Sequence, residues 1–167
     1  KRYSTVSTPH HSYDNLLIDL TVTALHQVWC SDLSRFEYRG AVWYLATIEV
    51  LATRQILAKR IGKRHDSQLV LASLHQAFAT GVTPFIFHSD QGTEFMAQRC
   101  KAYLDERDIR ICVSDVASPW QNGYVESFYG RFKHELGDLD RFVQAAPSVA
   151  GHLTQSIGQL VFLLRRQ

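Results

Sequence analysis

The stretch Phe-Ile-Phe-His-Ser-Asp-Gln-Gly (residues 85–92) joins an apolar run to a carboxylate and a turn. The short run 85–87 is typical of a strand that is covered on both faces, as in the middle of an α/β sheet. Asp90 follows this strand, and Gln91-Gly92 favours a turn. A carboxylate at the carboxyl end of a central strand can point into the crevice where such sheets bind ligands, although it can also be a turn residue or a helix cap. The stretch therefore predicts an α/β fold with a candidate site at Asp90.

The segments around this stretch alternate between strand and helix patterns. The predicted strands cover 27–34, 41–50, 54–61, 85–87 and 109–113, and the predicted helices cover 66–80, 93–107 and 124–135. Asp66 and Ser67 can cap the first helix, and Gly81 can end it. Three strands in a meander followed by helix–strand–helix–strand–helix predict an α/β fold with a mixed five-stranded sheet flanked by helices.

The length and composition fit one domain. With 167 residues, 46% of them hydrophobic, the chain is long enough for one well-buried core and too short for two ordinary domains. Residues 1–14 are polar and read as a linker or tail, and 15–142 form the predicted core. Residues 143–167 read as an atypical amphipathic C-terminal helix, from a truncation or a change of frame.

Charge, cysteines and hydropathy exclude several classes of protein. A net charge of +2 is too small to indicate a polyanion partner by itself, and the basic run at 63–65 reads as a solvated face. Cys30, Cys100 and Cys112 form no Cys-x-x-Cys pair, so we expect buried thiols in a reducing compartment. No signal peptide or long apolar run is present, so we expect a cytoplasmic protein without a membrane partner.

Two further acidic residues accompany Asp90. Asp32 lies in Val-Trp-Cys-Ser-Asp-Leu-Ser (28–34), and Glu126 lies in the first turn of the last predicted helix, with 35 residues between Asp90 and Glu126. Asp32 alone can instead mark the end of its strand or pair with Arg35, and Glu126 can instead interact with the helix dipole. Carboxylates that converge make an oxygen-lined pocket for two divalent cations, which is the chemistry that breaks and joins phosphodiesters.

The helix of Glu126 carries a further indication. Residues 126, 130 and 133 lie on one side of this helix. Gly130 leaves room for a ligand to approach, and Lys133 can hold a phosphate. This face therefore suits one metal ligand and one phosphate contact.

Four short segments occur in order along the chain. They are Val-Trp-Cys-Ser-Asp-Leu-Ser (28–34), Trp-Tyr-Leu-Ala (43–46), His-Ser-Asp-Gln-Gly-Thr-Glu-Phe (88–95) and Ser-Pro-Trp-Gln-Asn-Gly-Tyr-Val-Glu-Ser-Phe (118–128). Together with the 35-residue gap and Lys133, they resemble the catalytic core of the DDE transposase and retroviral integrase superfamily. The resemblance is to the second-frame transposases of bacterial insertion sequences in particular.

The resemblance implies an RNase H-like fold and a catalytic metal site. Asp32, Asp90 and Glu126 would be both the catalytic residues and the ligands of two Mg²⁺ or Mn²⁺ ions. The implied activity is metal-dependent DNA strand cleavage and strand transfer. Carboxylates suit these hard cations better than Cys or His would.

The resemblance also implies DNA as the partner, at the element's ends and at the target. Because relatives act as dimers or larger assemblies, we expect this protein to self-associate as a homodimer or higher homo-oligomer. We expect no small-molecule substrate. Asn122-Gly123 gives the loop 114–123 freedom to close on DNA, and Trp120 is either a base-stacking residue or a hydrophobic anchor. The expected DNA contacts are Trp120, Gln121, Asn122, Tyr124, Arg131 and Lys133.

The sequence departs from the family pattern in two places. Glu49 stands on the second strand where an Asp is usual, and the resemblance ends near Phe142. Two other functions therefore stay open. One is an RNase H-like nuclease that hydrolyses without joining, and the other is a catalytically inactive domain for DNA binding or multimerisation.

Overall fold

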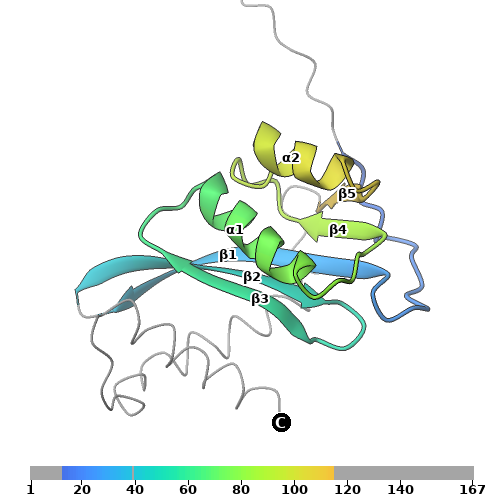
Figure 1. Cartoon of the computed structure of the whole chain (residues 1–167), viewed down its shortest axis with the longest axis horizontal. Coiled ribbons are helices and arrows are strands. Elements are labelled where there is room, and N and C mark those ends of the chain that lie inside the picture. The colour runs from blue at the N-terminus through green and yellow to red at the C-terminus, as the bar shows by residue number, and fades with distance from the viewer. Residues whose placement is uncertain (1–12, 39, 115–167) are drawn as a thin grey trace, which may run out of the picture.

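The computed structural model describes residues 13–38 and 40–114, which form a sheet covered by two helices (Figure 1). The predictions for the 115–123 part of the loop, the 124–135 helix and the C-terminal helix lie outside these residues. In chain order the elements are β1 (Val28–Tyr38), β2 (Ala41–Val50), β3 (Ile56–Gly62), α1 (Ser67–Phe78), β4 (Ile86–Ser89), α2 (Gln98–Asp105) and β5 (Arg110–Val113).

The strands form one mixed sheet in the order β3-β2-β1-β4-β5. β1, β2 and β3 are an antiparallel meander, whereas β4 runs parallel to β1, and β5 runs parallel to β4. The two parallel steps are made by α1 and α2, since parallel neighbours need a crossover connection. The predicted mixed five-stranded sheet is confirmed.

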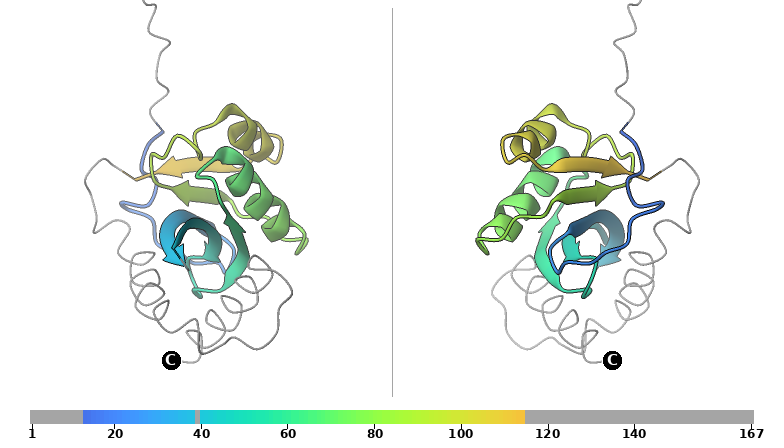
Figure 2. Two further views of the ribbon diagram at one scale, coloured as in Figure 1. Left: turned by 90° about the vertical axis from the view of Figure 1, so that its left-hand side faces the viewer. Right: turned by 90° about the vertical axis from the view of Figure 1, so that its right-hand side faces the viewer.

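The two faces of the sheet are covered differently. Both helices lie on one face (Figure 2), where Trp29 and Phe87 pack against Val70 and Leu74 of α1 and Leu104 of α2. The opposite face carries a second apolar cluster. That cluster contains Val28, Cys30, Trp43, Leu45, Ile86 and Cys112, with Leu16, Leu17, Leu20 and Val22 of the N-terminal segment packed against it. Strands buried on both faces explain the unbroken apolar runs in the sequence.

The predicted helix over 66–80 is present as α1. The Asp66 carboxylate accepts a hydrogen bond from the Leu69 backbone N–H at 3.1 Å, which is the predicted cap. Beyond its end, Gly81 has φ +77°, a left-handed conformation that glycine adopts without a steric cost. Within the described residues, no helix has the length and apolarity that a membrane span requires.

Several element boundaries differ from the prediction, and three of the differences have a clear structural reason. β1 continues to Tyr38 because its pairing with β2 runs on to the Tyr38–Ala41 pair. β3 begins at Ile56 because Arg54, with φ +61°, belongs to the turn. The helix predicted from residue 93 begins only at Gln98, since residues 92–96 form a separate turn and Ala97 is extended.

Candidate active site

Asp32 lies in the middle of β1, at the point where β1 separates from β4. The parallel pairing of these strands includes Val28, Trp29 and Cys30 of β1, with Cys30 opposite His88. Within the described residues, β1 then continues alongside β2 only. Asp32, two residues past Cys30, therefore lies at the carboxyl end of the parallel part of the sheet, which is the edge where α/β sheets bind ligands.

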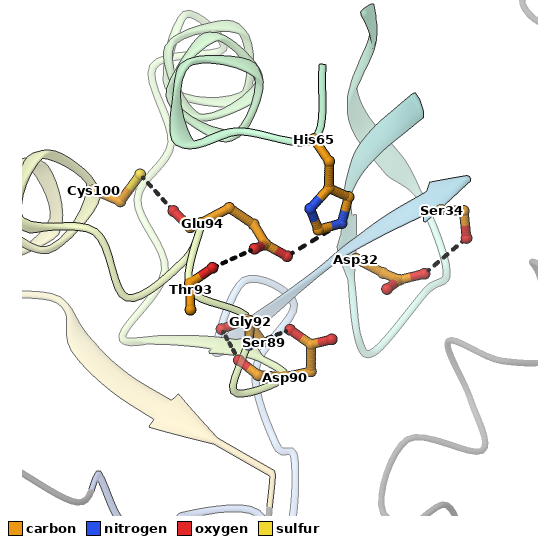
Figure 3. Close-up of polar contacts among 9 residues, drawn as sticks. All are labelled: Asp32, Ser34, His65, Ser89, Asp90, Gly92, Thr93, Glu94 and Cys100. Carbon is orange, nitrogen blue, oxygen red and sulfur yellow. Dashed lines mark hydrogen bonds and ion pairs between the residues drawn. The ribbon is translucent and has the colours of Figure 1, made fainter. Parts of the chain in front are cut away.

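Asp90 reaches the same edge from β4. It is two residues past His88, as Asp32 is two residues past Cys30, so the two acids leave neighbouring strands at one level. Neighbouring strands are about 4.8 Å apart. Figure 3 shows the two side chains next to each other, in agreement with this register. The structure thus brings Asp32 and Asp90 together.

Hydrogen bonds orient both carboxylates. Oδ1 of Asp90 accepts the backbone N–H of Gly92 at 2.9 Å, and Oδ2 of Asp32 accepts the Ser34 hydroxyl at 3.2 Å. Oδ2 of Asp90 has no hydrogen bond within the part of the chain that the structure describes. One oxygen of Asp90 therefore shapes the turn while the other is available to a cation.

The sequence left structural roles open for Asp32 and Asp90, as a strand end or partner of Arg35 and as a turn residue. Asp32 does not mark the end of its strand, because β1 continues to Tyr38, and Arg35 pairs with Glu37 at 2.7 Å. The turn role of Asp90 is real, because its bond to Gly92 is an Asx turn. Such a bond uses one oxygen and is compatible with a ligand role for the other.

The third predicted acid, Glu126, lies outside the described residues, as do the expected DNA contacts Trp120, Gln121, Asn122, Tyr124, Arg131 and Lys133. Among residues 13–38 and 40–114, no three His, Cys, Asp or Glu side chains come together in a group that could hold a metal ion. Asp32 and Asp90 are thus two of the three predicted ligands, and the roles of all three stay predictions.

A row of buried cysteine and histidine side chains crosses the sheet next to the two acids. Cys30, His88 and Cys112 are register partners on β1, β4 and β5, and the His88 ring Nδ1 lies 3.1 Å from Cys112 Sγ. All three cysteines of the chain are buried and free, as predicted. Burial raises the pKa of the Cys30 thiol, and the nearby Glu49 raises it further. A thiol held protonated by burial is a packing group rather than a nucleophile.

Glu49 is a buried carboxylate beside Asp32. It stands opposite Cys30 on β2, is only 3% exposed and pairs with the Arg54 guanidinium at 3.3 Å. Burial raises the pKa of Glu49 above its usual value, Arg54 lowers it, and the charge of Asp32 raises it further. The charges of Asp32 and Glu49 therefore influence each other.

Two residues near Asp90 were not expected from the sequence. Glu94 is buried, and its Oε1 lies 3.4 Å from Nε2 of His65, at the junction of β3 and α1 (Figure 3). His65 lies in the basic run that the sequence suggested to be a solvated face. No periodicity joins these residues, and the signals that the sequence offers are the place of Glu94 in the 88–95 segment and its spacing of four positions after Asp90.

The chain matches known protein families. Residues 23–119 match the family described as integrase core domain, and residues 107–155 match a second family of the same description. The second match extends past Phe142. The predicted resemblance to transposases and integrases is therefore confirmed.

Curated relatives are bacterial. A transposase-like protein of Haemophilus influenzae is 31% identical over 79% of this chain and 62% of its own length. A putative transposase for insertion sequence element IS150 of Escherichia coli is 28% identical over 74% of this chain and 44% of its own. The chain thus spans about half the length of the relatives it matches.

Solved structures share the fold. The catalytic core domain of HTLV-2 integrase, in complex with magnesium, has a TM-score of 0.65 at 17% identity and covers 83% of this chain and 84% of its own. The intasome of simian T-cell lymphotropic virus has a TM-score of 0.72 at 18% identity, and the match covers 93% of this chain and 53% of that chain. The RNase H-like fold is confirmed by these likenesses.

Proposed function

The chain belongs to the integrase core domain family, and we propose that it is the catalytic core of a DNA transposase that cleaves and joins DNA strands with divalent metal ions. The observation that carries this proposal is the meeting of Asp32 and Asp90 at one edge of the sheet. The names of the bacterial relatives support the choice of transposition over other reactions of the fold.

The donor atoms at this edge fit Mg²⁺ or Mn²⁺. Both ions prefer oxygen ligands, and Asp32 and Asp90 offer carboxylate oxygens that hydrogen bonds already orient. Asp32, Asp90 and Glu126 would hold two ions. When bound, such ions activate the attacking oxygen and stabilise the leaving oxygen of a phosphodiester.

The residues of the chain have separate tasks in this proposal. Ser34 and Gly92 fix the directions of the two carboxylates, so little reorganisation is needed when a cation arrives. Preorganised ligands of this kind serve in-line displacement, which needs no covalent link between the protein and DNA.

DNA is the proposed substrate, at the element's ends and at the target. Lys133, Arg131 and the 118–124 segment stay the predicted DNA contacts, and phosphate contacts would make binding strongly dependent on salt. We also propose that the protein self-associates and acts in the bacterial cytoplasm. The trimeric form reported for the HTLV-2 core supports self-association as a property within this fold.

The test is metal-dependent cleavage and joining of element-end DNA by the full-length protein. Asp90→Asn keeps the size of the side chain and removes its charge. We expect at least an approximately hundredfold loss of activity, since loss of an outer partner of a metal ligand already costs about 10–100-fold. Asp105→Asn, an exposed acid at the end of α2, is the matched control and should keep wild-type activity.

Two outcomes would contradict the proposal. Equal activity of Asp90→Asn and the wild type would reject the site. Cleaved products without any joined strands, under conditions where a related transposase joins them, would favour a nuclease that only hydrolyses.

A further inference from the structure

Glu94 is a buried carboxylate with partners on several sides. Only 8% of the residue is exposed. Its Oε1 pairs with Nε2 of His65, and its Oε2 accepts the Thr93 hydroxyl at 3.2 Å. A buried carboxylate is costly unless it is paired and hydrogen-bonded, so these contacts determine where the side chain lies.

The backbone of Glu94 is held as well. The thiol of Cys100 donates to the Glu94 carbonyl oxygen at 3.4 Å. Burial raises the pKa of Cys100 to about 11, so the thiol is protonated at neutral pH and can donate this bond. Glu94 therefore connects the 90–95 turn to both α2 and the start of α1.

His65 is fixed from the other side. Its ring makes an edge contact with the ring of Tyr44 on β2, with centroids 5.1 Å apart and planes at 65°. The His65 side chain is 42% exposed, so Tyr44 and Glu94 hold a ring that also faces solvent. The contact between His65 and Glu94 thus links the turn after β4 to the antiparallel half of the sheet.

Gly92 connects this pair to Asp90. A Cβ at Gly92 would displace Glu94 Oε1, which lies closer than any Cβ contact allows, and would lie 2.9 Å from Asp90 Oδ1. The same Gly92 donates its N–H to that Asp90 oxygen. The Glu94 carboxylate and the Asp90 carboxylate therefore both lie against one backbone unit, and displacement of Glu94 would release the unit that orients Asp90.

We propose that Glu94, held by His65, is a positioning residue for Asp90: the His65–Glu94 pair fixes the Gly92 peptide and thereby the direction of the Asp90 carboxylate. The proposal rests on the proposed function in that Asp90 is taken as a metal ligand. Partners behind a ligand commonly set its orientation and the affinity of the metal.

The experiment compares His65→Ala, His65→Gln and Arg64→Ala in the full chain. His65→Ala removes the partner of Glu94, whereas the amide of His65→Gln can still donate to Glu94. Arg64→Ala is the matched control, because Arg64 is 78% exposed and pairs with Asp66 rather than with the turn. Two quantities are measured: hydrogen exchange of the Gly92 amide without metal, by NMR, and the dissociation constant for Mn²⁺, by calorimetry.

We expect His65→Ala to speed Gly92 exchange by at least about fivefold, as for a local opening, while the Leu74 amide in α1 is unchanged. Its dissociation constant for Mn²⁺ should rise by about tenfold. His65→Gln and Arg64→Ala should stay within about twofold of wild type in both measurements, the scatter expected when no contact to the turn is lost.

Wild-type values for His65→Ala in either measurement would overturn the proposal. A loss shared equally by His65→Gln or Arg64→Ala would also overturn it, because the effect would not depend on the contact to Glu94. If the wild type shows no Mn²⁺ binding that depends on Asp90, the proposed function fails instead. The Gly92 exchange rate, measured without metal, then still decides whether His65 fixes the turn.

Discussion

Carboxylates near the edge of the sheet differ in their surroundings. Asp90 gives one oxygen to a backbone N–H, Asp32 accepts from a hydroxyl, and Glu49 is buried against Arg54. The first two are partly exposed, while Glu49 is almost fully covered. Ligands for a cation must stay accessible, so these differences separate the proposed metal ligands from a structural carboxylate.

The raised pKa of Glu49 predicts how the stability of the protein depends on pH. Because its folded pKa lies above its usual value of 4.5, the folded state holds the proton more tightly than the unfolded state. The stability that this tighter proton binding contributes to the wild type is therefore lost as the pH rises from about 4.5 through the raised folded pKa of Glu49. Glu49→Gln lacks this loss, so its melting temperature relative to wild type should increase as pH rises from 4.5 to about 8 in circular dichroism melts.

Glu37→Gln is the control for this measurement. Glu37 is 66% exposed in its pair with Arg35, so its replacement should show no comparable rise with pH. A difference between Glu49→Gln and wild type that stays flat or falls with pH would contradict the account.

At the level of single residues, the sequence singled out part of the candidate site. Asp32 and Asp90 each lie in a local motif at a predicted strand, so both acids could be singled out from the sequence, whereas the order of the strands in the sheet was not predicted. The contact between His65 and Glu94 was not predictable either, because it joins the start of α1 to a turn 29 positions later. Such a contact depends on how a helix and a turn pack, which no local pattern records.

Among the elements, β1 and the turn before α2 determine where the site lies. β1 is 11 residues long, and its first part pairs with β4 while its whole length runs beside β2. The length mismatch between β1 and the four-residue β4 creates the edge at which the acids meet. The sequence placed both strands but ended β1 at Ser34, since alternation beyond that point depends on the partner strand.

The late start of α2 has a local cause. The N–H groups of Phe95 and Met96 both bond to the Gly92 carbonyl, and Ala97 is extended at ψ 139°. These bonds close a turn before the helix begins. The residues 93–97 have helix-compatible side chains, so the sequence alone did not separate the turn from the helix.

The cap of α1 gives a prediction at the element scale. Asp66 accepts from the Leu69 N–H with one oxygen and pairs with Arg64 at 3.0 Å through the other. Asp66→Ala should lower the free energy of unfolding by about 1 kcal/mol in urea titration, because the Leu69 N–H loses its side-chain acceptor. Asp66→Asn keeps an acceptor and should lose much less, and equal losses in the two variants would show that the cap is not the cause.

Across the whole molecule, one sheet supports a core on both faces and a site at its edge. Helices cover one face, and the N-terminal segment covers part of the other, where the backbone N–H of Leu16 lies 3.1 Å from Cys112 Sγ. The fold class was predictable because each element has a clear pattern. Glu126 and the basic residues after it stay predictions, as do the boundaries at residues 14 and 142.

The most direct measurement of the central claim is a crystal soaked in Mn²⁺ and examined by anomalous diffraction. The account predicts an anomalous peak between the carboxylates of Asp32 and Asp90, and the loss of that peak in Asp90→Asn crystals grown and soaked in the same way. Wild-type crystals with Mn²⁺ bound elsewhere and none between these two carboxylates would contradict it.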